Sequence, residues 1–189
     1  MSKALKRLKE DLVVSRQSGR IRLLQADVLL DKLAANYEPP DIEERYRGRC
    51  DLPSNEITRR LTAAASSRKG KVILTGSASA EKYAVAAREP VVSLYTSLSP
   101  SELLAGSDLA IKETDRFANL EILRTADGRV FFDPRIEDGL PYASPVQTYL
   151  ELASGDKRQK DAAEQVRGSI LASLGQPGDD DRPNRENVS

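Results

Sequence analysis

Two short apolar segments with an alanine-rich segment between them place the strongest constraint on the fold. KVILTG (residues 71–76) and PVVSLYTSL (90–98) have the length and composition of buried strands, while SASAEKYAVAA (77–87) predicts a helix with Ser77 as its N-cap. A chain that alternates strands and helices in this way predicts a mixed sheet with helices packed on it. We therefore expect the fold class to be α+β (mixed α/β).

Further helices and a hairpin are expected around this centre. SNEITRRLTAAASS (54–67) predicts a helix capped by Ser54 or Asn55, and SPSELLAGS (99–107) a short one. ANLEILRTADGRVFFD (118–133) predicts two strands about Asp127-Gly128, because Asp-Gly favours tight hairpin turns.

The C-terminal part predicts two more helices. SPVQTYLELA (144–153) places Ser144 at the N-cap, Pro145 at the first helical position and Gln147 at the third, which is the pattern of a capping box. A last helix is expected at 160–174, with one apolar side formed by Ala163, Val166, Ile170 and Leu174. The segment after Gly175 has almost no apolar residues and is expected to be a disordered tail.

The N-terminal part predicts a small separate unit. Leu5, Leu8 and Leu12 fall on one face of a helix over residues 2–12, and a hairpin is expected about Gln17-Ser18-Gly19. A helix over 26–37 would end at Pro39-Pro40. Residues 38–53 predict a connector, although EERYRGR within them could pair as a strand.

Positive charge is concentrated near the N-terminus of the chain. Residues 2–22 hold seven basic and two acidic side chains, a net charge of +5, whereas the whole chain balances 29 basic against 29 acidic residues. A basic helix followed by a basic hairpin is the order in which a winged helix-turn-helix presents its recognition helix and wing to DNA. The plainer alternative is a solvated helix face beside a surface hairpin.

Composition excludes several classes of function. The chain has one cysteine and no histidine, which excludes an internal disulfide, a multi-cysteine zinc site and nucleophilic catalysis by a Ser/His/Asp or Cys/His arrangement within it. No apolar run approaches the ~18 residues of a membrane span, and the N-terminus has no signal-peptide block. We expect a cytoplasmic protein with no membrane association, no metal and no cofactor, and we assign no catalytic residues.

Two enzyme hypotheses are alternatives to DNA binding. The strand-to-helix turn at Gly76-Ser77 is similar to the entrance of a nucleotidyltransferase fold, but Ser93 and Tyr95 stand on the next strand where two metal-binding carboxylates are needed. A nuclease centre needs an (Asp/Glu)-x-Lys motif, but Leu123 stands where the lysine after Glu121 is required. The other carboxylates near strands that could contribute to such a centre are Glu102, Asp108, Glu113 and Asp115. Cys50 is expected to be a structural thiol.

These segments together resemble the AbiEi-type antitoxins, which are transcriptional regulators of type IV toxin-antitoxin systems. The resemblance covers about residues 2–174, and its specific parts are LTGSASAEKYA (74–84) and SPVQTYLELA (144–153). It implies an N-terminal winged helix-turn-helix, here residues 1–37, followed by a larger α/β domain over 38–174 and the tail over 175–189. Met1 stands where the recognition helix should begin, so the unit is expected to be only the second half of a winged domain.

The resemblance also implies a function. Family members bind double-stranded DNA at their own promoter, repress their operon and oppose a nucleotidyltransferase toxin encoded beside them, without needing to bind it. The residues that match the recognition helix and wing, and are therefore candidates for DNA contact, are Lys3, Lys6, Arg7, Lys9, Arg16, Arg20 and Arg22. The apolar side of the helix would then need another surface, such as the main domain or a second copy of the chain in a homodimer. The first alternative is a nucleotidyltransferase-like domain that binds nucleotide or has lost catalysis, and the second is a module that only binds other proteins.

Overall fold

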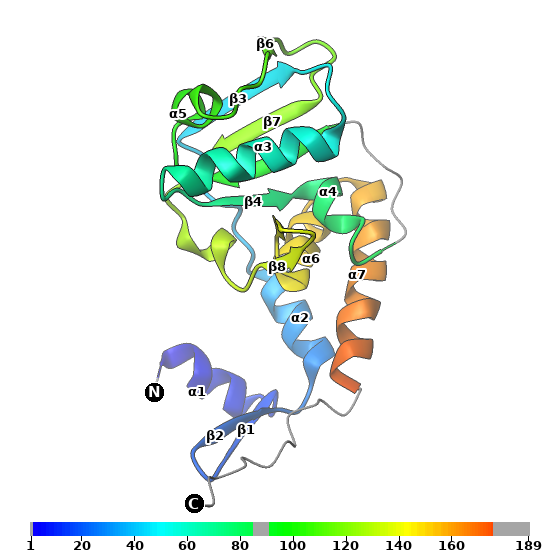
Figure 1. Ribbon diagram of the computed structural model, residues 1–189. Helices are drawn as coiled ribbons and strands as arrows, with labels where there is room; N and C mark the ends of the chain where they lie inside the picture. Colours follow the sequence, from blue (N-terminus) through cyan, green and yellow to red (C-terminus); the bar gives the residue numbers. More distant parts are fainter. Residues whose placement is uncertain (1, 85–90, 176–189) are drawn as a thin grey trace, which may run out of the picture.

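The computed structural model describes residues 2–84 and 91–175. Its architecture is mixed α/β, with a seven-stranded mixed sheet and a separate two-stranded hairpin (Figure 1). The fold class expected from the sequence is confirmed.

The N-terminal unit consists of α1 (Lys3–Glu10), β1 (Val14–Gln17) and β2 (Arg20–Leu23). Helix α1 begins after Ser2, whose Oγ accepts a hydrogen bond from the backbone N–H of Leu5 at 3.3 Å. The helix ends earlier than expected, because Leu12 adopts a left-handed backbone conformation (φ 57°) that a helix cannot continue through. The expectation that Leu12 extends the apolar face of α1 is therefore wrong.

The large sheet combines strands from distant parts of the chain. Strand β5 lies parallel to β7 and β4 lies parallel to β9, while the other pairs are antiparallel. In spatial order the strands are β6 (Lys112–Glu113), β3 (Glu44–Arg49), β7 (Leu120–Arg124), β5 (Val92–Thr96), β4 (Val72–Thr75), β9 (Leu140–Tyr142) and β8 (Arg135–Glu137). The segment expected to be a connector thus contains β3, and EERYRGR is a strand of the main sheet.

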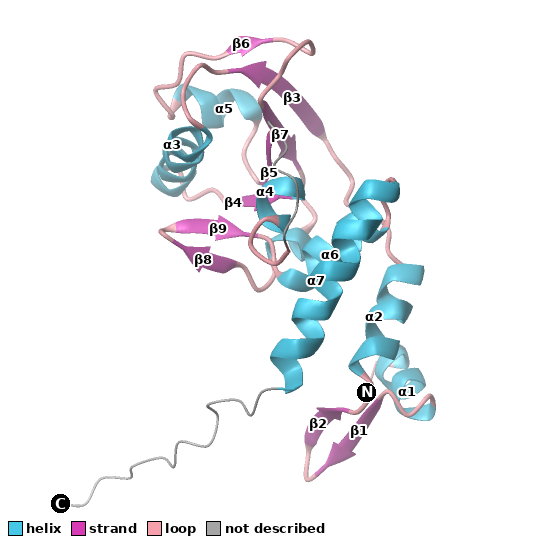
Figure 2. Cartoon of the chain, turned by 90° about the vertical axis from the view of Figure 1, so that its right-hand side faces the viewer, coloured by secondary structure: helices cyan, strands magenta, loops and turns pink. Residues whose placement is uncertain are grey.

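One face of the sheet is covered by α3 (Ser54–Ser67) and α5 (Pro100–Ala105) (Figures 1 and 2). The register aligns Leu74, Leu94 and Ile122 across neighbouring strands, so their side chains point to the same face. There they pack against Ile57 and Leu61 of α3, and all five side chains are buried. This layer is the main hydrophobic core.

A second core lies among four helices below the sheet in Figure 1. Helix α2 (Ala26–Ala35) packs against α6 (Pro145–Ala153) and α7 (Lys157–Gly175), and α4 (Gly76–Ala80) packs against α6. The cluster is centred on Leu30, Tyr149 and Val166, which are all buried. Of the apolar side expected for the last helix, Ala163, Val166 and Ile170 are buried, but Leu174 is 56% exposed.

The expectation of a hairpin at Asp127-Gly128 is wrong. Asp127 instead caps a short 3-10 helix, η1 (Gly128–Phe131), by accepting a hydrogen bond from the N–H of Arg129 at 2.9 Å. The Asp-Gly hairpin of this protein lies further along the chain: Asp138 (φ 51°) and Gly139 (φ 77°) form the two-residue turn between β8 and β9.

The predicted helix starts have mixed outcomes. Ser144 caps α6 as expected, accepting from the N–H of Gln147 at 3.1 Å, with Pro145 at the first helical position. Neither Ser54 nor Asn55 is the N-cap of α3, which is Pro53, and α4 begins after Thr75 rather than after Ser77. The last part of the helix predicted at 77–87 and the predicted tail after residue 175 lie outside the described residues.

Candidate nucleic-acid interface

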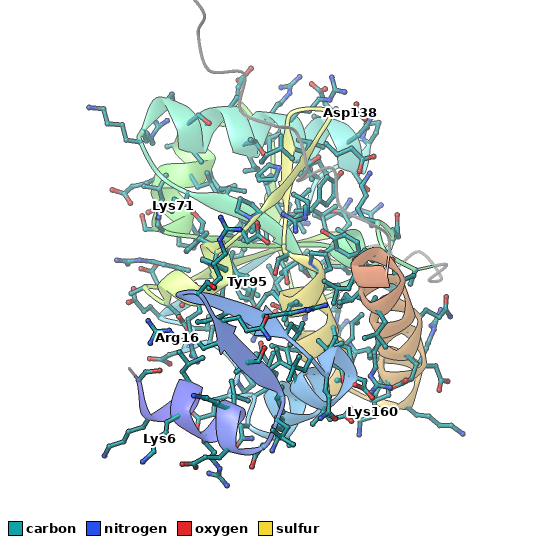
Figure 3. The ribbon with its side chains drawn as sticks, turned by 90° about the horizontal axis from the view of Figure 1, so that it is seen from below. Lys6, Arg16, Lys71, Tyr95, Asp138 and Lys160 are labelled. Atoms are coloured by element: carbon teal, nitrogen blue, oxygen red, sulfur yellow. The ribbon has the colours of Figure 1, made fainter. Side chains whose placement is uncertain are left out.

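The cations of the N-terminal unit all lie on its surface. Each of the seven side chains proposed for DNA contact is exposed: Lys3, Lys6, Arg7, Lys9, Arg16, Arg20 and Arg22. Figure 3 views the molecule from this end and shows Lys6 on α1 and Arg16 on the hairpin, coming from two separate elements. Six of the seven lie on three surfaces, and Lys9 lies where α1 meets the hairpin.

The first surface is the outer face of α1. Lys3, Lys6 and Arg7 are three and four residues apart, which places them on the same side of the helix, whereas Leu5 and Leu8 point the other way and are half-buried. The structure shows one ion pair on this face, a 3.9 Å contact between Nζ of Lys6 and Oε1 of Glu10. Because both partners are highly exposed, this pair leaves the face accessible to an anion.

The second and third surfaces are the two sides of the hairpin. Val14 pairs with Leu23 and Arg16 with Ile21, so Arg16 shares a face with three apolar side chains. Arg20 and Arg22 lie on the opposite face. The sequence did not predict this division, because it depends on the register that the Ser18-Gly19 turn imposes.

The apolar face of the hairpin meets α1 at a small groove. Leu5 and Lys9 of α1 line it together with Val14, Arg16 and Ile21 of the hairpin. Lys9 and Arg16 therefore lie close to the contact between helix and hairpin, and the outer face of α1 and the Arg20–Arg22 face remain the two open basic surfaces.

This unit has almost no core of its own. Helix α1 has no buried residue, and within the described chain several of its neighbours are strongly exposed: Leu12 by 65%, Ile21 by 56% and Leu24 by 49%. Val13, just before the hairpin, and Val14, the first residue of β1, are buried. The unit is linked to α2 by the chain itself and by the bond from Nζ of Lys32 to Asp11.

Helix α2 connects the N-terminal basic unit (α1, β1 and β2) to the main body of the protein by packing and by charge. Leu30 is buried in the second core, and Asp31 accepts a hydrogen bond from Nη2 of Arg167 on α7 at 3.0 Å. On the other side, Nζ of Lys32 donates to Asp11 at 2.8 Å, and this bond lowers the pKa of the Asp11 carboxyl. The helix thus contacts the basic unit at one side and α7 at the other.

A polar network lies just after the end of α2 and was not predicted from the sequence. Glu151 of α6 accepts hydrogen bonds from Oγ1 of Thr75 and from Nε2 of Gln147, the latter at 2.8 Å. Nε2 of Gln147 also donates to the hydroxyl of Tyr37 at 3.2 Å, and Tyr95 lies close enough to Glu151 for the two groups to affect each other's pKa. The only signal in the sequence was the spacing of Gln147 and Glu151 on one helix face.

Burial dominates the electrostatics of this network. It raises the pKa of Glu151, against the opposing effect of the donors around it. Burial, followed by the nearby Glu151 charge, raises the pKa of Tyr37 to about 12 and that of Tyr95 further. The tyrosines therefore act as neutral hydrogen-bonding groups at physiological pH. Through Tyr37, the network holds the chain in place just after the end of α2.

The rival nucleotide site has no carboxylate pair on β5. Oγ of Ser93 donates to Oε2 of Glu121 at 3.3 Å, and Tyr95 is buried in a cluster with Ile73 and Leu123. Gly76 has φ +60° and allows the tight turn from β4 into α4. Cys50 is a buried free thiol in the main core.

The carboxylates considered for a nuclease are dispersed. Glu102 accepts from Ser99 at the start of α5, Asp115 lies near Arg47, and Asp108 lies near Arg60. In the parts of the chain that the structure describes, no group of three or more Asp, Glu or Cys side chains is arranged to hold a metal ion.

Comparisons with known proteins add no further constraint. No protein-family model, no curated protein and no solved structure matches the chain. Within residues 2–84 and 91–175, no helix is both long and apolar enough to cross a membrane.

Proposed function

We propose that this protein is a DNA-binding transcriptional regulator that acts as the antitoxin of a type IV toxin-antitoxin system. In this role it represses its own promoter and opposes a nucleotidyltransferase toxin encoded beside it. The observation that carries the proposal is the exposure of all seven cations on α1 and the hairpin. The resemblance of the sequence to AbiEi-type antitoxins supplies the biological role.

The arrangement of the cations supports a specific way of contacting DNA. Phosphate groups are neutralised by Lys and Arg, and each neutralised phosphate releases counterions from the duplex. The outer face of α1 presents Lys3, Lys6 and Arg7 together, so this face is the primary phosphate contact. Arg20 and Arg22 extend from the hairpin to the neighbouring backbone.

The test of DNA binding is a titration of the full chain against a fluorescent duplex from the promoter of its own gene, repeated at several salt concentrations. The variant K3E/K6E/R7E should bind more weakly, and its salt dependence should be shallower by about 2.7 in log–log slope, because each lost phosphate contact contributes ~0.9. The matched control is K157E/R158E/K160E, which reverses three exposed cations at the start of α7. Equal losses in the two variants would attribute binding to overall charge and contradict the proposed interface.

The antitoxin role needs a separate test. The full chain, expressed from an unrelated promoter, should restore growth to cells that produce the neighbouring nucleotidyltransferase. Because repression of the native promoter plays no part in that assay, failure would refute the antitoxin role and leave the DNA-binding role standing. A scrambled duplex in the first experiment provides the corresponding control for specificity.

A further inference from the structure

The edge strand β8 presents its backbone and an apolar side chain to solvent. It is the terminal strand of the seven-stranded sheet, with β9 as its partner, and all three of its residues are exposed. Ile136 at its centre is 65% exposed, and Phe132 just before the strand is 75% exposed. Figure 2 shows the β8–β9 hairpin at the border of the sheet. An exposed edge with apolar side chains is a template for pairing with another strand.

The geometry of the hairpin fixes which backbone groups point outward. Glu137 and Leu140 flank the two-residue Asp138-Gly139 turn, and Ile136 lies opposite Pro141. Proline has no N–H, so Ile136 occupies a non-hydrogen-bonded position relative to β9. Its own N–H and C=O therefore point away from β9, toward the open edge.

The sequence of β8 is complementary to itself. In an antiparallel pair of two β8 strands centred on Ile136, Arg135 of one copy lies opposite Glu137 of the other, and the reverse pair forms across the two-fold axis. The two Ile136 residues would exchange a pair of backbone hydrogen bonds, and the Arg135–Glu137 positions would then be the closer, non-hydrogen-bonded pairs. Opposite charges at such positions favour this register over one centred on Arg135 or on Glu137, which would place two like charges opposite each other.

The existing contacts of the two charged residues are compatible with such pairing. Nη1 of Arg135 donates to Asp133 at 2.8 Å, and Nζ of Lys82 donates to Glu137 at 2.8 Å. The side chains of Arg135 and Glu137 are 53% and 57% exposed, so each has room for a second partner. Asp133 and Arg135 of one copy would then form a charge network across the axis with Glu137 and Lys82 of the other.

We infer that β8 is a homodimerisation strand, which pairs antiparallel with β8 of a second copy about a two-fold axis at Ile136. The interface is short, so the dimer belongs to the weak, transient class of association that is typical of interfaces below about 1,200 Å². This inference does not depend on DNA binding, because it concerns the edge of the sheet opposite to β6 and uses none of the cations of α1 or the hairpin.

The first test uses charge reversal in the full chain. In E137R both edge positions are arginine, and in R135E both are glutamate, so each variant alone should remain monomeric in sedimentation experiments at concentrations where the wild type dimerises. Mixing the two variants should restore a heterodimer, because every cross-axis pair is again of opposite charge. Restoration on mixing also shows that both variants are folded. Failure of the wild type to self-associate at protein concentrations on the order of 100 μM, well into the range of weak interfaces, would overturn the inference.

The second test is a cross-link at the axis. A hydrogen-bonded antiparallel pair separates its Cα atoms by about 5.5 Å, within the range that a disulfide spans. Ile136→Cys should therefore form a covalent dimer on mild oxidation, and the native Cys50 should not interfere because it is buried. The control is Phe117→Cys, since Phe117 is 85% exposed but lies away from β8. Equal cross-linking of the two variants would mean random collision and would contradict pairing at β8.

Discussion

Replacing Leu30 by alanine should detach the basic unit from the main body, because Leu30 anchors α2 in the second core. The side chain is 4% exposed and packs in the cluster that contains Tyr149 and Val166. The change removes three carbon atoms, worth about 2.4 kcal/mol at ~0.8 kcal/mol each, and leaves a cavity between α2, α6 and α7. Buried Leu→Ala changes span about 2–5 kcal/mol, so we expect a loss of about 3 kcal/mol in the free energy of unfolding.

The control for this experiment lies on the same helix. Leu33 is 39% exposed, so Leu33→Ala has the same effect on helix propensity but should cost less than about 1 kcal/mol. Urea unfolding measures both losses, and amide hydrogen exchange reports whether α2 opens locally before the sheet does. Equal losses for the two variants would refute the view that Leu30 is the anchor, and unchanged exchange in α2 would show that its attachment lies elsewhere.

Two further predictions concern the polar network and the β8–β9 turn. Because the folded-state pKa of Glu151 is raised, its protonated form stabilises the fold below the ordinary carboxyl value of 4.5, and this contribution is lost as the pH rises through the folded pKa. Glu151→Gln should therefore gain stability relative to the wild type between pH 4.5 and neutrality in urea titrations; a constant difference would contradict the assigned burial. Gly139→Ala should cost about 1–2 kcal/mol, since alanine resists the left-handed φ of +77° although its Cβ would meet no atom within 4 Å. Gly128→Ala is the matched control, because its Cβ also has open space without a positive φ, and equal thermal stability of the two variants would show that the turn tolerates side chains.

The sequence predicted those elements whose signal is local. Strands β4 and β5 were predictable because they are short, mostly apolar and rich in β-branched residues, and α6 because Ser144 and Pro145 mark its start. Strand β3 was not predicted as part of the sheet, because among its core-facing positions Gly48 must stay small: a Cβ there would lie 2.6 Å from Ile111. The strand therefore shows no alternating apolar pattern.

The two Asp-Gly pairs show the limit of local reasoning. Asp127-Gly128 is preceded by the clear strand signal of β7, yet Asp127 caps η1, and the hairpin forms at Asp138-Gly139 between two three-residue strands. What decides between them is the pairing of β9 with β4, a contact between distant segments. In the candidate interface, exposure of the cations followed from residue type, but the separation of Arg16 from Arg20 followed only from the hairpin register.

The attachment of α2 has a consequence for the order in which the chain matures during synthesis. Helix α1 and the hairpin depend on neighbouring residues and can form within microseconds of leaving the ribosome. The partners of α2 come much later: Gln147 is 110 residues beyond Tyr37, and Arg167 is 136 residues beyond Asp31. At about 5–20 residues per second, the ribosome needs roughly 7–27 seconds to translate the 136 residues that separate Asp31 from Arg167. Of the elements described, the basic unit therefore emerges before the partners that anchor it, and a nascent chain that stalls before α6 would carry it unanchored.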